Sequence, residues 1–315
     1  MKFLYRDILK KSWLITKKLR YLWFFGAFAA LAGNGEEYDI IVRNLDTAAN
    51  LEIRIQALRE ALNEGVWPVV SENLRLFFTT NIFSSLLVIF AGLVIAVAIT
   101  YLITISQIAI IRAASLFEKG EKSEFFDGFV YGTKFFWPVL LLNIIAKTII
   151  YGLLLVVGIP LAIGYVNSGN LFALTVLSVF SFLVLVPFNI FVSFLVRYAS
   201  INIILRAGKV TESVKYGFHL FRKNWLITLE NALLLYVINF VIIFTIVSIT
   251  SFLGLPFTPA GYVFFTALII FASGVVAVFS FSAWTYLFNT ISQGQGISKL
   301  IRMFKKNPKE EIKEK

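Results

Sequence analysis

Two charged side chains lie inside stretches of sequence that are otherwise apolar. Lys147 comes ten residues after Trp137, and Glu230 comes five residues after Trp225. If a helix enters a membrane at each tryptophan, a rise of ~1.5 Å per residue places Lys147 about 15 Å deep and Glu230 about 7–8 Å deep. A charge at the middle of a bilayer costs about 2.5–3.5 kcal/mol on insertion scales, so such residues usually face a partner or a cavity. These two residues are therefore the first candidates for a functional site.

Two asparagines accompany the charges. Asn143 lies one helical turn before Lys147, Asn231 adjoins Glu230, and each asparagine comes six residues after its tryptophan. Side chains of a helix lean toward its N-terminus, which brings the Lys147 ammonium toward the level of Glu230. The sequence predicts an intramembrane polar cluster of Asn143, Lys147, Glu230 and Asn231. Three interpretations stay open: a buried ion pair that fixes helix register, a polar pocket or conduction path, and two charges that extend separately to the interface.

The elements that hold these residues are membrane-spanning helices. Apolar residues make up 58% of the 315 residues and charged residues only 15%, whereas soluble domains carry about 25% charged residues. A helix needs about 20 apolar residues to cross the ~30 Å hydrocarbon core. Five stretches meet this length: 82–111, 136–160, 171–196, 225–253 and 261–290. Pro160 and Pro187 are expected to end or kink their helices.

A sixth apolar segment, 21–33, is shorter than the others. It fits a retained span, a re-entrant segment, or the apolar region of a cleaved signal peptide. The distribution of basic residues favours the span: with six crossings and both termini cytoplasmic, 24 Lys and Arg lie inside and four Arg outside. If 21–33 did not cross, the basic residues would divide 17 to 11, with the larger number outside. Because cytoplasmic loops are enriched in Lys and Arg, the sequence predicts six spans with both termini inside.

This topology assigns the remaining segments. Residues 1–20 form an interfacial helix, 34–80 an extracytoplasmic insertion, and 291–315 a basic cytoplasmic tail. The net charge of +11 is then a signal of membrane orientation, and no basic–aromatic motif for nucleic-acid binding accompanies it. We expect a single multi-pass domain in the plasma membrane. Its expected partners are anionic lipid headgroups at the cytoplasmic face, and a membrane-protein partner stays open.

Three basic runs each lead to a tryptophan that opens a span. They read ITKKLRYLW at 15–23, VYGTKFFW at 130–137 and HLFRKNW at 219–225. Such basic amphipathic helices lie in the headgroup plane, and Trp23, Trp137 and Trp225 fall where interfacial anchors are expected. The sequence therefore predicts an all-α, polytopic transmembrane bundle. Its six spans are built from three helix-pair repeats with cytoplasmic interfacial amphipathic helices.

Known catalytic and metal-binding patterns are missing from the sequence. The chain has no Cys and one His, which excludes thiolate sites and multi-histidine metal sites. It contains no GxxxxGK[ST] phosphate loop, no HExxH pair and no GxSxG elbow. We therefore expect no catalytic residues, no metal and no cofactor.

The runs ILKKSWLITKKLRYLWFFGAFAAL at 8–31 and GF…FRKNW at 217–225 resemble a group of bacterial six-span membrane proteins. The group includes the membrane domain attached to some glycerophosphoryl diester phosphodiesterases. The resemblance extends over essentially the whole chain, but it supplies no catalytic residues, and no phosphodiesterase domain is present to carry hydrolytic activity. The favoured function is a non-enzymatic scaffold or lipid- or partner-interacting module. The alternative is a small transporter or channel that uses Lys147 and Glu230.

Overall fold

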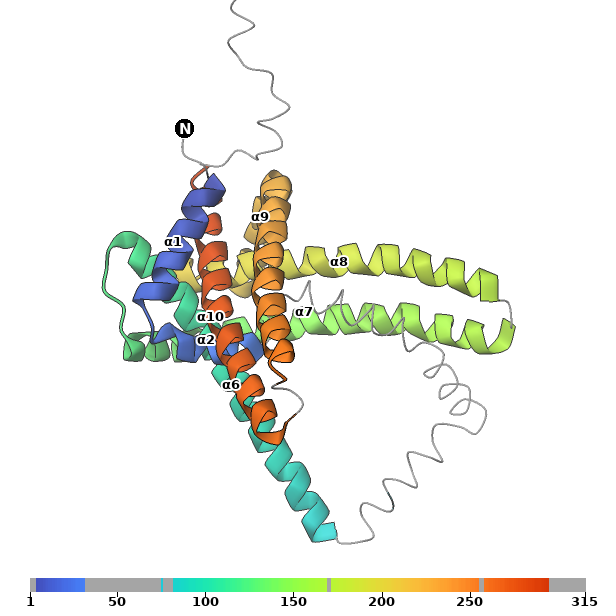
Figure 1. Ribbon diagram of the computed structural model, residues 1–315. Coiled ribbons are helices and arrows are strands. Elements are labelled where there is room, and N and C mark those ends of the chain that lie inside the picture. The colour runs from blue at the N-terminus through green and yellow to red at the C-terminus, as the bar shows by residue number, and fades with distance from the viewer. Residues whose placement is uncertain (1–3, 32–74, 76–81, 169–170, 255–257, 295–315) are drawn as a thin grey trace, which may run out of the picture. The chain divides into compact units, whose positions relative to one another are not determined.

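The computed structural model describes residues 4–31, 75, 82–168, 171–254 and 258–294. Over these ranges the chain is helical, which confirms the all-α prediction there (Figure 1). The helices are α1 (Leu4–Lys18), α2 (Leu22–Leu31), α6 (Ile82–Lys119), α7 (Phe125–Ser168), α8 (Leu171–Arg206), α9 (Val210–Phe252) and α10 (Pro259–Ser292).

Five of these helices, α6 to α10, are long and apolar enough to cross a membrane. Four of the five long spans predicted from the sequence lie entirely within one of them, and the remaining span, 225–253, ends one residue after α9. The length and composition of these helices are those of a multi-pass membrane protein. α7 continues through Pro160, and Pro187 lies inside α8, so neither proline ends its helix.

The predicted sixth span, 21–33, is helical over the ten residues Leu22–Leu31. A helix of this length reaches about 15 Å, half of the ~30 Å hydrocarbon core. Because 32–74 lie outside the described residues, the sixth crossing stays a prediction. The insertion at 34–80 and the tail at 291–315 lie almost entirely outside the described residues as well.

The basic segment before the fifth span is continuous with it. α9 begins at Val210, well before Trp225, and its helical geometry is interrupted at Asn224, with φ −128° and ψ 28°. The Asn224 side chain donates to the Leu220 backbone carbonyl (3.1 Å), and the backbone carbonyl of Asn224 accepts from the Thr228 hydroxyl (2.9 Å). Such side-chain bonds compete with the helix ladder and bend it. A kink immediately before Trp225 therefore separates the two parts of one helix.

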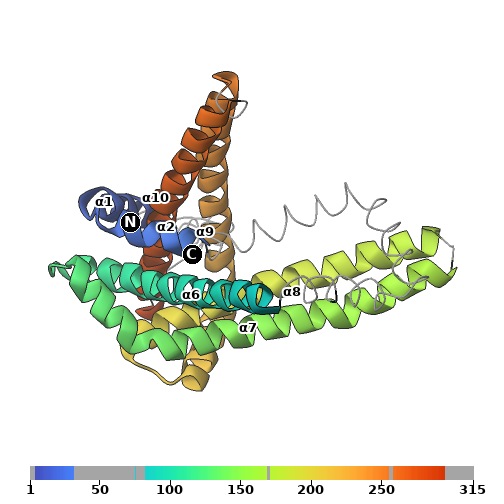
Figure 2. The same cartoon turned by 90° about the horizontal axis from the view of Figure 1, so that it is seen from below.

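The described helices divide between two compact units, Met1–Gly35 with Leu102–Asn143 and Phe194–Lys315, and Glu36–Tyr101 with Ile144–Ser193. In the first unit, α10 contacts α1, α2 and α9 (Figures 1 and 2). Gly26 of α2 packs directly on the Gly274 carbonyl of α10. A Cβ added at Gly274 would meet the Ala27 nitrogen at 2.9 Å. The small residues thus allow two backbones to approach closely, as in other membrane helix pairs.

Close helix contacts at glycine also occur elsewhere in the first unit, and two of them are as follows. In one, a Cβ added at Gly132 of α7 would meet the Ile105 side chain of α6 at 2.6 Å. In the other, a Cβ added at Gly217 of α9 would meet the Ala199 nitrogen of α8 at 3.2 Å. The missing side chain of glycine at these positions allows the two helices of each pair to approach closely.

The second unit contains parts of α6, α7 and α8, and its surface is strongly apolar. Large side chains such as Phe83, Phe90, Val156 and Leu183 are more than half exposed. In water this exposure would be unfavourable, but lipid tails are as apolar as the side chains themselves. The exposed surface of this unit therefore suits a hydrocarbon environment.

Candidate functional site

Glu230, the first of the predicted site residues, is half-buried on α9 in the first unit. Its carboxylate accepts a hydrogen bond from the hydroxyl of Tyr5, which lies in the first described turn of α1. A hydrogen bond to an ionised group stabilises by about 1.5–3 kcal/mol. Sequence reasoning did not single out Tyr5, because nothing in the pattern of α1 indicates that its hydroxyl faces a carboxylate 225 positions away.

Asn231, the next residue on α9, is 1% exposed. Neither its amide nitrogen nor its amide oxygen has a hydrogen-bond partner among the described residues. Burying an unpaired polar group costs about 1–3 kcal/mol in proteins. An asparagine retained at such a cost is a candidate for binding a polar group.

Asn231 belongs to a row of polar side chains that we call the polar seam: Tyr198, Thr228, Asn231, Asn239 and Ser280. The hydroxyls of Tyr198 on α8 and Thr228 on α9 are 2.7 Å apart. Asn239 of α9 donates to the Ser280 hydroxyl of α10 at 3.3 Å. The seam thus runs where α9 meets α8 and α10. Its signal in the sequence is the spacing of Asn224, Asn231 and Asn239 by about two helical turns each.

For Asn143 and Lys147, the other two predicted members of the cluster, the described residues show no contact with Glu230 or Asn231. Asn143 is half-buried on α7 in the first unit, and Lys147 is exposed on α7 in the second unit. Each unit is described by itself, so the proposed pairing of Lys147 with Glu230 stays a prediction.

The three tryptophans expected as interfacial anchors have different environments. Trp23 is half-buried, its indole donates to the Thr16 carbonyl at 2.8 Å, and its ring packs edge-on against Phe271 of α10. It therefore ties α1, α2 and α10 together. Trp137 and Trp225 are 74% and 54% exposed, as an anchor at a lipid surface would be.

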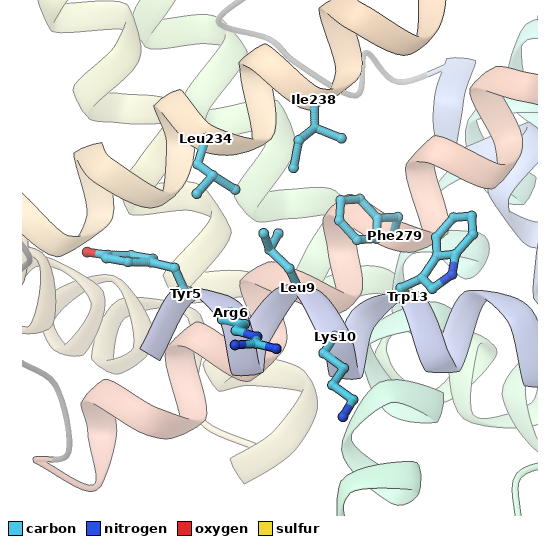
Figure 3. A pocket seen from close by; sticks show the side chains of 8 residues that line it. All are labelled: Tyr5, Arg6, Leu9, Lys10, Trp13, Leu234, Ile238 and Phe279. Carbon is cyan, nitrogen blue, oxygen red and sulfur yellow. The ribbon is translucent and has the colours of Figure 1, made fainter. Parts of the chain in front are cut away.

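A groove of about 560 Å³ lies between α1, α9 and α10 within the first unit (Figure 3). We call it the α1 groove; it is lined by Tyr5, Arg6, Leu9, Lys10, Trp13, Leu234, Ile238 and Phe279. Leu9 points into the space below Leu234 and Ile238, whereas Arg6 and Lys10 extend from the opposite side of α1 (Figure 3). Arg6 and Lys10 are four residues apart in the sequence, which places them on one face of a helix, but the sequence gives no indication that α9 and α10 lie beside them.

Basic residues surround these helices. Within 4–20, 119–134 and 206–223, every Lys and Arg is exposed. In the described part of the chain no three His, Asp or Glu side chains gather as a metal site.

Comparison of the chain with family models, with curated proteins and with solved structures finds no match. The function is therefore argued from the residues and contacts above.

Proposed function

We propose that the protein is a non-enzymatic multi-pass membrane protein whose basic helices bind anionic lipid headgroups at the cytoplasmic face. In this role it acts as a scaffold or as a module that presents lipid to a partner. The observation that carries the proposal is the exposure of every Lys and Arg in 4–20, 119–134 and 206–223. Each such residue near an anionic leaflet contributes about 1 kcal/mol of attraction.

The six-span topology is part of the same proposal. It places these three basic segments on one side of the membrane, together with both termini. The weak charge of the turns on the other side supports it: between α9 and α10, residues 253–258 carry no charged side chain.

A pair of matching contacts supports the proposed repeat. Arg112 lies over the ring of Tyr131 at 4.5 Å, and Arg206 lies over the ring of Tyr216 at 4.7 Å. Each tyrosine is followed by a glycine that packs on the preceding helix, on Ile105 in the first case and on Ala199 in the second. Each arginine comes seven residues after that packing residue. The α6–α7 and α8–α9 junctions therefore fit two copies of one unit.

The test is purification of the full chain in its native lipid, followed by identification of the lipids and proteins that remain bound. Reconstitution into vesicles of phosphatidylcholine, with and without phosphatidylglycerol, complements it. We expect enrichment of anionic lipid around the protein and a decrease of that enrichment with salt, because exposed charges are screened. Equal association with both vesicle compositions would contradict the proposal.

A second candidate function, transport of a polar solute or ion, is favoured by one observation. Asn231 is buried with an unpaired amide in a seam that extends to Asn239, eight residues or about 12 Å further along α9. Polar side chains at such depth often line a substrate or ion path. Flux assays in proteoliposomes test this function. A flux abolished by Asn231→Leu would support transport over the scaffold.

A further inference from the structure

We propose that the α1 groove holds an acyl chain of one anionic phospholipid, with the lipid phosphate bound by Arg6 and Lys10. The inference deepens the proposed function and rests on it, because it assigns the general attraction for anionic lipid to one defined site. The groove is formed entirely within the first unit.

The groove lining combines apolar residues, which suit a lipid tail, with cations, which suit its phosphate. Leu9, Leu234, Ile238 and Phe279 supply an apolar wall, and Figure 3 shows Arg6 and Lys10 extending on the opposite side of α1. Both cations belong to the residues that line the groove. In the proposed site their charged ends extend to the headgroups, as snorkelling side chains do. The site therefore offers apolar contacts for a lipid tail and positive charge for its phosphate.

Charge complementarity selects an anionic lipid over a neutral one. Arg6 and Lys10 are both exposed and unneutralised by any carboxylate of the groove lining, which contains no acidic residue. The nearby Glu230 carboxylate accepts the Tyr5 hydroxyl. An arginine fork and a lysine point charge are both established ways of binding a phosphate.

Exposed apolar residues lie beside the groove. Leu233 and Val237, the α9 residues next to the lining residues Leu234 and Ile238, are 62% and 50% exposed. At the other end the ring of Trp13, 57% exposed, packs edge-on against Phe279. Indole rings favour the headgroup level of a membrane. The volume of about 560 Å³ also lies within the ~300–1,000 Å³ typical of small-molecule sites.

The acyl-chain part is tested with Leu234→Trp, which fills the groove, against Leu233→Trp on the neighbouring exposed position. The full chain is reconstituted in phosphatidylcholine with a minor fraction of phosphatidylglycerol, extracted in mild detergent, and analysed by native mass spectrometry. We expect the unaltered protein and Leu233→Trp to retain one phosphatidylglycerol and Leu234→Trp to lose it. Equal retention by the two tryptophan variants would overturn the site.

The headgroup part is tested with the double variant Arg6→Gln/Lys10→Gln against Lys17→Gln/Arg20→Gln. The control removes two exposed charges from the same segment, and neither of them lines the groove. At about 1 kcal/mol per charge, the groove variant should lose retained phosphatidylglycerol roughly fivefold per cation. The control should weaken only the general, salt-sensitive enrichment of anionic lipid and keep the single retained phosphatidylglycerol. Arg6→Lys/Lys10→Arg should keep both, which also shows that the segment folds. Equal losses in the two double Gln variants would mean diffuse attraction, which overturns the groove but leaves the proposed function intact.

A photo-reactive phenylalanine analogue in place of Ile238 identifies the occupant directly. We expect a cross-link to phosphatidylglycerol. A cross-link to another segment of the same chain, or to a second copy, would overturn the lipid assignment. If the unaltered protein shows no preference for phosphatidylglycerol in any assay, the proposed function itself fails.

Discussion

The two units have similarly apolar helices but differ in how closely those helices are packed. In the first unit the C-terminal half of α10 is enclosed by its neighbours, and Ala277, Val278, Ala283 and Leu287 are completely buried. In the second unit the large apolar side chains of α6 are exposed. A Cβ added at Gly92 would have no atom of another helix within 4 Å. Apolar composition therefore does not by itself tell whether a side chain faces protein or lipid.

Small and polar residues mark the difference. In the first unit a Cβ added at Gly26, Gly132 or Gly217 would meet another helix, whereas one added at Gly92, Gly152 or Gly158 of the second unit would meet no other helix within 4 Å. Without a hydrophobic driving force between helices in lipid, close backbone contact and hydrogen bonds supply the association. The first unit is accordingly where the polar seam and the α1 groove are found.

The largest effect is expected from Gly26→Leu. The new side chain would overlap the Gly274 backbone of α10, which cannot move aside as a flexible side chain can. Overpacking costs about 1–3 kcal/mol and occasionally more, and a backbone obstacle places this variant at the upper end. Gly92→Leu is the matched control and should change the free energy of unfolding little. Unfolding in mixed micelles measures both; similar losses would show that the units are packed alike.

The next effect concerns the two intramembrane charges. Tyr5→Phe removes a donor to the Glu230 carboxylate and should destabilise by about 1.5–3 kcal/mol. Lys147→Met removes an exposed charge from the second unit and should have a much smaller effect. The same unfolding assay also tests the exchange of Lys147→Glu with Glu230→Lys. Rescue of both single variants by this double exchange would favour the ion pair and disagree with the Tyr5 assignment.

Asn231→Leu should have an effect of opposite sign. Removing an unpaired buried amide is expected to stabilise by about 1–2 kcal/mol. Asn239→Leu is the control, because it breaks the bond to Ser280 and should not stabilise. A loss of stability in Asn231→Leu would indicate that the amide binds a group in the membrane-embedded protein.

The smallest effect is expected at the surface of the first unit. Lys11 lies 3.8 Å from the Glu118 carboxylate, with side chains 55% and 26% exposed. Exposed ion pairs contribute about 0–1 kcal/mol, so Lys11→Gln should change the unfolding free energy by less than about 1 kcal/mol. A larger loss, measured at high salt as well as low, would show that Lys11 acts through packing on Tyr286.

The long helices were predictable because a run of about 20 apolar residues identifies a span without any tertiary information. The sequence did not predict which helices pack against one another. A helix that is apolar on all sides gives no periodic signal for the face that packs, so the contact of Gly26 with Gly274 could not be read from the sequence. Of the two outcomes predicted for Pro160, an end or a kink of the helix, the end is wrong, because membrane helices tolerate proline when neighbouring groups satisfy the freed carbonyl.

For the site, the sequence identified Glu230 and Asn231 from the rarity of polar residues in spans. It could not identify Tyr5 as a partner, since α1 and α9 are joined only by the fold. The α1 groove was likewise hidden, because it needs three helices that are far apart in the chain.

The central claim is that the basic segments face the cytoplasm and the turn after α9 faces outward. The chain has no Cys, so single cysteines at the exposed positions Lys122 and Leu253 report on each side separately. With a membrane-impermeant maleimide and intact cells, Leu253→Cys should be labelled and Lys122→Cys should be labelled only after the membrane is opened. Labelling of Lys122→Cys in intact cells would contradict the orientation, and with it the proposal that the basic helices bind lipid at the cytoplasmic face.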